Sequence, residues 1–431
     1  MKVLLLTNIV PPQISGIIGR KKVVTGGWLH SVVDYLSKQP EMEIGICVPD
    51  GRTEVLVSGA INGLTYYFYP EKNSSEYLLQ TDKIFAKILN DFNPDIINIF
   101  GTEYPRTLSM INSAHNAKVV ITMTGIISIY ANHYFGRVPI RMQLPNWRLV
   151  FKLGKKFMNI PTLWEGRKDF IKRGRYEIEA VHKAKYIIGR TRFDKAFVLN
   201  ENPDIKYFHC NESLRNPFYN NDWSFEKCIK HSIFLPQAGY PIKGFEVFLE
   251  GLKVLKRKYQ DVKVFIPGVS VFALNNSIKS KIKIIASDYD SYIKKLVDQY
   301  NLWENITFVG LLDEEEMMKT MKKCNVFVLP SAVENSPNTL GEAMLLGMPC
   351  VSACVGGVQD LISDSQEGFL YPYDEPHIMA YQISTIFDDA DTAKRLGNNA
   401  KKRASVTHNL ENNMRQLIDI YTKVLEENEV E

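Results

Sequence analysis

Residues 326–362, VFVLPSAVENSPNTLGEAMLLGMPCVSACVGGVQDLI, decide the fold of this chain. The four apolar residues 326–329 predict a buried strand that the following proline ends. The Ser-Pro pair after a polar loop is typical of a helix start, and we expect this helix to end at Gly347 with a proline just beyond. Residues 350–352 predict a second strand, followed by a Gly-Gly turn into another helix. This order of elements predicts a βαβ unit of a parallel sheet.

Two carboxylates flank the predicted start of this helix. Ser336 is the expected N-cap, so the backbone N–H groups after it lack partners within the helix and favour an anion such as phosphate. Glu334 and Glu342 lie on either side, with seven residues between them. A carboxylate beside a phosphate is unfavourable unless it accepts hydrogen bonds from hydroxyl groups, as a ribose or a sugar would supply. Phosphate and sugar together indicate a nucleotide sugar.

The E-x7-E pair, the SPNT helix start, the GEAMLLGMP continuation and the GG turn together resemble the donor site of family-4 retaining glycosyltransferases, which have the GT-B fold. The resemblance implies an α/β chain with two Rossmann-like doubly wound domains facing across a cleft, and a C-terminal helix that crosses back to the first domain. The alternative is a surface loop and an amphipathic helix that happen to carry acids. We expect an acceptor-binding N-terminal domain at 1–212, a linker at 213–230, a nucleotide-sugar-binding domain at 231–405 and the returning helix at 406–431.

Composition is consistent with two soluble α/β domains. The chain has 431 residues, 45% hydrophobic and 23% charged, and no run of eighteen apolar residues that could span a membrane. The apolar start at 2–8 is short and lacks a cleavage site, so we interpret it as a core strand and not a signal peptide. The six cysteines include no CxxC pair and are expected to be reduced core residues. We therefore expect a cytoplasmic protein.

A basic segment at 137–175 stands out from the net charge of +4, because it contains eleven Lys or Arg and only two acids. Aromatic residues are interleaved with these cations. The pattern suits an anionic membrane surface or an anionic acceptor, and it would place the protein at the periphery of the inner face of the membrane. A solvated helical insertion is the alternative. No nucleic-acid-binding motif accompanies the segment, so we expect no nucleic-acid partner.

The first half of the chain alternates short apolar strands with helices, which predicts a doubly wound sheet. Such sheets bind ligands at the carboxyl ends of their strands, which directs attention to Glu103, Thr124 and Arg190. Gly26 and Gly27 open a helix after the first strand, without the closely spaced GxGxxG of a dinucleotide site. By resemblance these two glycines line the cleft opposite the donor site; the alternative is a glycine pair that serves packing.

The resemblance also implies how a donor diphosphate is bound. Lys243, in a Lys-Gly element before a helix, matches the lysine that neutralises the diphosphate, together with the amides of Asn338 and Thr339. The family usually has an arginine six residues before this lysine, where this chain has Gln237. Arg190 is a candidate to supply the missing cation.

The sugar and the base are assigned in the same way. Glu342 would accept hydrogen bonds from the ribose, Glu334 from the transferred sugar, and the base would lie near Gly310. Many members of the family have a histidine at about the position of Thr124, pointing at the sugar. His133 could replace it, although a lone histidine is more often an ordinary surface residue.

We therefore predict a retaining glycosyltransferase that moves a sugar from a UDP- or GDP-linked donor to a hydroxyl of a saccharide or lipid-linked acceptor in surface polysaccharide synthesis. No cofactor or metal is expected, because the sequence has no cluster of metal-ligand spacing. One alternative is another GT-B enzyme such as a hydrolysing nucleotide-sugar epimerase, for which His133 and Glu103 would be the proton-transfer candidates. Another is a catalytically silent nucleotide-sugar-binding subunit, which the departures at Gln237 and Thr124 would favour.

Overall fold

The protein is described by a computed structural model that covers residues 1–18, 27–144, 161–268 and 287–427. Its chain forms two compact units, and each is described by itself. Unit 1 consists of Met1–Ile129, Phe170–Arg215 and His408–Glu431, and unit 2 of Tyr130–Asp169 and Asn216–Thr407.

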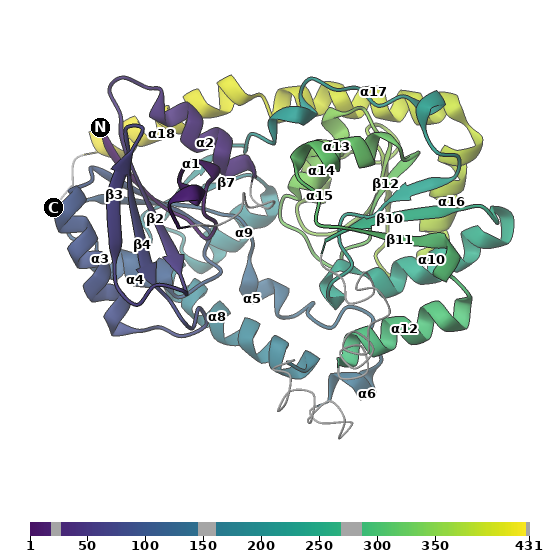
Figure 1. Ribbon diagram of the computed structural model, residues 1–431, viewed down its shortest axis with the longest axis horizontal. Coiled ribbons are helices and arrows are strands. Elements are labelled where there is room, and N and C mark those ends of the chain that lie inside the picture. Colours follow the sequence, from purple (N-terminus) through teal and green to yellow (C-terminus); the bar gives the residue numbers. More distant parts are fainter. Residues whose placement is uncertain (19–26, 145–160, 269–286, 428–431) are drawn as a thin grey trace. The chain divides into compact units, whose positions relative to one another are not determined.

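Unit 1 is built on an eight-stranded sheet in the order β3-β4-β2-β1-β5-β6-β7-β8 (Figure 1). Every neighbouring pair is parallel except β3 and β4. Because the strand order reverses between β1 and β5, the sheet is doubly wound, as predicted, and its topological switch point lies there. The strands are β1 (Lys2–Leu6), β2 (Glu43–Asp50), β3 (Val57–Ile61), β4 (Leu64–Pro70), β5 (Ile96–Phe100), β6 (Lys118–Thr122), β7 (Tyr186–Gly189) and β8 (Lys206–His209).

The antiparallel hairpin of β3 and β4 was not anticipated from the sequence, although the signal for it is present. Asn62 and Gly63 join the two strands with φ of 50° and 78°. Positive φ at both central residues is the geometry of the tightest hairpin turns, which favour an Asn-Gly pair. The hairpin adds an edge strand to the parallel sheet.

Alternate residues of each strand enter two separate cores on the two faces of this sheet. Val3 and Leu5 pack in one cluster with residues of α2 and α18, whereas Leu4 and Leu6 pack in the other with residues of α3, α4, α8 and α9. Strands that are buried on both faces are typical of parallel sheets. The helices are α1 (Pro12–Ser15), α2 (Gly27–Ser37), α3 (Leu79–Phe92), α4 (Arg106–Ser113), α5 (Ile127–Tyr130), α8 (Leu163–Lys183), α9 (Arg192–Glu201) and α18 (Leu410–Glu426).

Unit 2 repeats this plan with a fully parallel six-stranded sheet in the order β11-β10-β9-β12-β13-β14. Its switch point lies between β9 and β12, because the chain proceeds from β9 to one side and then returns to β12 on the other. The strands are β9 (Ser232–Phe234), β10 (Lys263–Pro267), β11 (Ile306–Gly310), β12 (Val326–Leu329), β13 (Cys350–Ala353) and β14 (Phe369–Tyr371).

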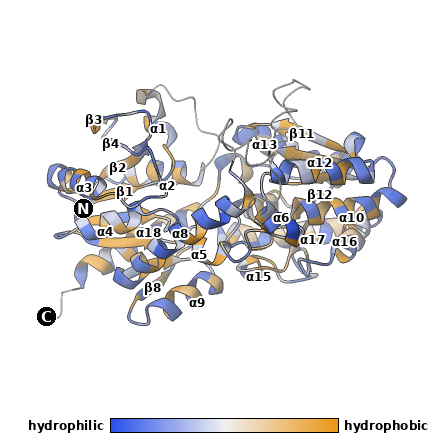
Figure 2. Cartoon of the chain, turned by 90° about the horizontal axis from the view of Figure 1, so that it is seen from below, coloured by the Kyte–Doolittle hydropathy of each residue, from blue (hydrophilic) through white to orange (hydrophobic). Residues whose placement is uncertain are grey.

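The helices of unit 2 are amphipathic, with hydrophobic and hydrophilic residues mixed along α10 and α12 in Figure 2. Helix α10 packs against α12 and α16, and α14 packs against α17. The helices are α6 (Ile140–Gln143), α10 (Phe245–Lys258), α12 (Asp288–Tyr300), α13 (Glu314–Lys322), α14 (Asn338–Leu345), α15 (Val358–Leu361), α16 (Pro376–Asp388) and α17 (Ala390–Thr407). Short 3-10 turns occur at η1 (Gly16–Ile18), η2 (Asn216–Phe218), η3 (Phe225–Lys227), η4 (Pro241–Lys243) and η6 (Trp303–Asn305).

Two boundaries differ from those expected. Residues 130–169 were assigned to the first domain but are grouped with unit 2. Polar contacts described below attach residues 130–139 to that unit. The expected linker at 213–230 is packed into unit 2 in its second half, where the indole N–H of Trp223 donates to Cys324 O at 2.7 Å. Part of the basic segment, 145–160, lies outside the described residues. Within the described residues, no helix is both long enough and apolar enough to cross a membrane.

The C-terminal helix is attached to unit 1 by a buried hydrogen bond, which yields a prediction. Tyr421 Oη accepts from Asn98 Nδ2 at 2.6 Å, and both residues are fully buried. We expect Tyr421→Phe to lower the free energy of unfolding by about 1–3 kcal/mol, because it leaves the Asn98 donor without this acceptor. Urea unfolding followed by circular dichroism measures the change.

The control is Tyr381→Phe, since Tyr381 is 73% exposed. This change should stay within about 0.5 kcal/mol of the wild type. Equal effects of the two substitutions would contradict a structural role for the Asn98–Tyr421 bond.

Candidate functional site

Two loops meet at the switch point of unit 2, and each contributes one charged side chain. The loop after β9 leads through η4 to Lys243, and the loop after β12 carries Glu334. Lys243 Nζ lies 2.6 Å from Glu334 Oε1, and the same oxygen accepts from the Ser331 hydroxyl at 2.7 Å. The two charged side chains are only 16% and 9% exposed. The sheet topology therefore places this largely buried ion pair where doubly wound sheets bind ligands.

The electrostatics keep the lysine charged. Burial alone would lower the pKa of Lys243, but attraction to the Glu334 carboxylate, followed by that of the Tyr240 hydroxyl, outweighs it and raises the pKa above its usual value. Lys243 is thus a fixed cation at neutral pH, and in the absence of ligand its charge is balanced by Glu334.

The Lys-Gly element positions this cation through a tight turn. Gly244 has φ of 67°, and a Cβ atom there would lie 1.7 Å from Pro330 O. Only glycine fits this conformation and this close approach. Ala332 N–H also donates to Ile242 O at 2.7 Å, so the two loops are bonded through their backbones as well as through the ion pair.

Helix α14 begins directly after Glu334's loop. The N-cap is Pro337, one residue later than the expected Ser336, and it has extended backbone angles and no capping side-chain bond. Asn338 and Thr339 are therefore the first two helical residues. Glu342 follows in the next turn and is 3% exposed.

The Gly-Gly turn supports the backbone of the acidic loop. Gly357 N–H donates to Glu334 O at 3.1 Å, and α15 starts at the next residue. Hydrogen bonding thus connects the Gly-Gly turn to the loop before α14, and this contact holds the backbone of Glu334 in place.

The first-domain candidates Glu103 and Thr124 are brought together in unit 1. They follow β5 and β6, and Glu103 Oε1 accepts hydrogen bonds from the Thr124 hydroxyl and from Gly125 N–H, the latter at 2.8 Å. Both residues lie at the carboxyl edge of the sheet, as predicted. Whether they contact an acceptor stays a prediction.

A buried acid beside them was missed. Glu177 in α8 is fully buried and accepts from the hydroxyls of Thr102 and Ser128 and from the N–H groups of Ile127 and Ser128, at 2.5–3.1 Å. It therefore fixes the start of α5. Burial raises the pKa of Glu177 to about 7, the donors working against this shift and nearby Glu103 adding to it. In the sequence it is one acid among many on a polar helix, with no local signal.

Arg190 lies in unit 1 in a buried ion pair, with Nη1 at 3.0 Å from Glu212 Oε2. The structure thus shows a structural partner for this arginine, and its donor-binding role stays a prediction. Gln237 is exposed. Among the described residues, no group of three or more His, Cys, Asp or Glu is placed to hold a metal ion.

The remaining candidates are spread over both units. Gly27 begins α2, and a Cβ there would lie 2.3 Å from Cγ of Arg215, whereas Gly26 lies outside the described residues. Gly310 ends β11, two strands away from the switch point of unit 2. His133 is exposed and belongs to unit 2, although the sequence placed it in the first domain.

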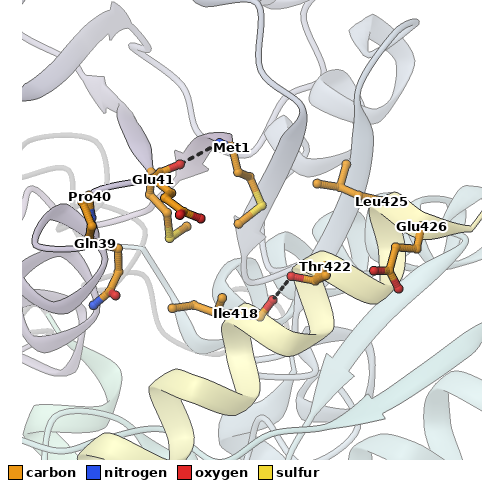
Figure 3. Close-up of a pocket in the computed structure, with 9 residues that line it drawn as sticks. Met1, Gln39, Pro40, Glu41, Ile418, Thr422, Leu425 and Glu426 are labelled. Atoms are coloured by element: carbon orange, nitrogen blue, oxygen red, sulfur yellow. Dashed lines mark hydrogen bonds between the residues drawn. The ribbon is translucent and has the colours of Figure 1, made fainter.

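A surface pocket of about 530 Å³ in unit 1 contains none of these candidates (Figure 3). It lies beside α18 and at the amino ends of β1 and β2, opposite to the edge where parallel sheets bind ligands. We therefore do not assign the function to it. Its lining residues are Met1, Gln39, Pro40, Glu41, Met42, Ile418, Thr422, Leu425 and Glu426.

The raised pKa of Glu177 predicts a pH dependence of stability. The folded protein holds a proton on Glu177 up to about pH 7, whereas the unfolded chain releases it near 4.5. The stabilisation is therefore complete below pH 4.5 and is lost as the pH rises toward 7. We expect Glu177→Gln to make the unfolding free energy fall less steeply over this window, measured from urea midpoints. An unchanged slope would contradict the assignment.

The ion pair predicts a non-additive pair of substitutions. Lys243→Met should lower the unfolding free energy by about 3 kcal/mol, because it leaves the Glu334 carboxylate buried without its cation. Adding Glu334→Gln should restore a substantial part of this loss, as a double-mutant cycle in urea would show. Additive effects would mean that the two side chains do not depend on each other.

Comparisons with known proteins relate the second half of the chain to glycosyltransferases. Residues 231–403 match the family model of the glycosyl transferases group 1. An uncharacterized glycosyltransferase of Methanocaldococcus jannaschii is 27% identical over 142 residues, which are 33% of this chain and 36% of that protein. Alpha-D-kanosaminyltransferase of Streptomyces kanamyceticus is 24% identical over 182 residues, 42% of this chain and 43% of that protein. The chain thus matches less than half the length of these relatives.

The fold extends over the whole chain. Sucrose-phosphate synthase of Thermosynechococcus elongatus has a TM-score of 0.70 at 15% identity, covering 98% of this chain and 99% of its own. HepE of Anabaena, solved with UDP-glucose, has a TM-score of 0.67 at 14% identity, covering 98% and 100%. The chain therefore has the GT-B fold, and residues 231–403 of its second unit are similar to the glycosyl transferases group 1 family.

Proposed function

We propose that the protein is a retaining glycosyltransferase that moves a sugar from a nucleotide diphosphate sugar to a hydroxyl of a saccharide or lipid-linked acceptor. The observation that carries this proposal is the Lys243–Glu334 pair at the switch point of unit 2, directly before the start of α14. It combines a fixed cation, the N-terminus of a helix and a buried acid within one pair of loops, which suits a diphosphate attached to a sugar.

The roles follow from the chemistry of these groups. A diphosphate that arrives beside Lys243 competes with Glu334 for the cation and frees the carboxylate to accept from a sugar hydroxyl. The amides of Asn338 and Thr339 would face the phosphates, and Glu342 would accept from the ribose. Donors aimed at the leaving diphosphate stabilise the charge that develops on it.

The proposed transfer step needs only the donor and the acceptor. The bond between the anomeric carbon and the diphosphate breaks, a bond from the acceptor oxygen forms on the same face, and the acceptor proton passes to the departing phosphate. Retention of the anomeric configuration distinguishes this proposal from an inverting transferase and can be measured by NMR of the product.

A role in surface polysaccharide synthesis is supported by relatives named WcaL from two bacteria. A protein of Salmonella typhimurium, WcaL, which its name assigns provisionally to colanic acid biosynthesis, is 26% identical over 139 residues, 31% of this chain and 34% of that protein. For the donor, HepE provides a precedent at the level of fold, because it was solved with UDP and with UDP-glucose. A UDP-linked donor is therefore the first to test.

The decisive experiment is a metal-free thermal-shift screen of UDP, GDP, ADP and their sugar conjugates. A ligand at a hundred times its dissociation constant stabilises the wild type by about 2.7 kcal/mol. Glu342→Gln should weaken nucleotide binding by about tenfold or more, because a hydrogen bond to a charged group contributes about 1.5–3 kcal/mol.

The matched control is Glu367→Gln, which changes a largely buried acid of unit 2 that pairs with Arg403 and lies outside the switch-point loops. It should bind the nucleotide as the wild type does. If no nucleotide shifts the wild type, or if both variants respond equally, the donor site is wrongly assigned. Slow hydrolysis of the donor without acceptor would separate a transferase from a silent binding subunit.

A further inference from the structure

A segment from the first half of the chain is attached to unit 2 beside the switch point. We call residues 130–139, YANHYFGRVP, the strap. It begins at the last residue of α5, after β6 in the sequence, yet it clusters with unit 2. Two of its side chains, Asn132 and His133, are exposed.

The first attachment of the strap is a buried carboxylate on α10. Arg137 N–H donates to Glu246 Oε1 at 2.9 Å, and Glu246 is 1% exposed. The hydroxyls of Tyr289 and Tyr373 donate to the same carboxyl group at 2.9 and 3.5 Å. A buried carboxylate is stable only if donors surround it, and the strap backbone supplies one of them.

The strap also lies directly against the Lys-Gly loop. A Cβ atom on Gly136 would come within 2.5 Å of Glu246 Oε1 and 2.7 Å of Pro241 O. Pro241 is two residues before Lys243. The backbone of the strap therefore touches the loop that carries the cation.

The second attachment is on the acidic loop. Asn335 N–H donates to the Tyr130 hydroxyl at 3.0 Å, and Asn335 follows Glu334 directly. Between the attachments, Arg167 Nε donates to Ala131 O at 3.1 Å. The strap thus spans the same two loops that the Lys243–Glu334 pair joins.

We propose that the strap forms a wall of the sugar subsite of the donor site, with Glu246 and Tyr130 as positioning residues that set which sugar is accepted. This inference rests on the proposed function. The strap contacts the loops after β9 and β12, whereas the base is expected near Gly310 at the end of β11, two strands away. It can therefore affect recognition of the sugar without affecting recognition of the nucleotide, through the exposed Asn132 and His133.

The test compares binding of UDP with binding of UDP-glucose, and of GDP with GDP-mannose, by calorimetry. Glu246→Ala and Tyr130→Phe should each reduce the preference for the nucleotide sugar over the free nucleotide by about tenfold or more, the loss of about 1.4 kcal/mol of sugar contacts. Binding of the free nucleotide should stay within about twofold. Glu246→Gln keeps an oxygen for Arg137 N–H and should recover much of the preference.

Glu250→Gln is the matched control, because Glu250 contacts the guanidinium of the same Arg137 at 3.3 Å but is 33% exposed and does not hold the strap backbone. Tyr259→Phe is the control for the tyrosine. Tyr259 follows the C-terminus of α10, and its hydroxyl donates to Asp388 at 2.8 Å, so it has no bond to the strap. Both should preserve the preference. Each variant is first checked for folding by circular dichroism.

The outcomes separate the two proposals. If the wild type binds neither nucleotide, the proposed function fails and the subsite with it. Suppose that the wild type binds, and that Glu246→Ala and Tyr130→Phe either keep its preference for the nucleotide sugar or lose affinity for the free nucleotide and the nucleotide sugar equally. The subsite inference then fails while the function stands. Tyr130→Phe removes a single oxygen, so it decides the question even if Glu246→Ala does not fold.

Discussion

One largely buried ion pair, Lys243 with Glu334, joins the two switch-point loops of unit 2. An ion pair of this kind is costly unless its geometry is good and further hydrogen bonds satisfy it. Here the carboxylate also accepts from Ser331, and the backbones of the two loops are bonded to each other. The pair lies where the strand order of the sheet reverses, so the fold itself brings the two loops together. The ion pair in turn fixes the positions of the Lys243 ammonium and the Glu334 carboxylate relative to each other at that edge.

A neutral pair at the site has a consequence for the donor. A lysine and an arginine together would attract a diphosphate by their net positive charge. This chain has Gln237 where the resemblance implies the arginine, and Gln237 is exposed. In the described loops, the charge of Lys243 is already balanced by Glu334. Under the proposed function the phosphate must replace the carboxylate as partner of the lysine, which couples diphosphate binding to release of the acid that would contact the sugar.

The sequence predicts what is local and misses what is distant. Residues 326–362 could be interpreted because strand, loop, helix and turn follow one another without interruption, and only the N-cap moved by one residue, from Ser336 to Pro337. The β3–β4 hairpin carried its own Asn-Gly signal and was overlooked. The strap could not be assigned to unit 2, since Arg137 and Glu246 are 109 residues apart and nothing in either neighbourhood indicates their contact. The roles of Glu103, Thr124, Arg190 and His133 were inferred from strand ends and resemblance, and they remain hypotheses.

Both ends of the short helix α5 take part in hydrogen bonds with residues discussed above. In unit 1 its first N–H groups, at Ile127 and Ser128, are fixed by the buried Glu177. In unit 2 its last residue, Tyr130, accepts from Asn335 beside Glu334. Glu177 is therefore a positioning residue for the start of α5, and the Tyr130 hydroxyl helps to fix the backbone directly after Glu334.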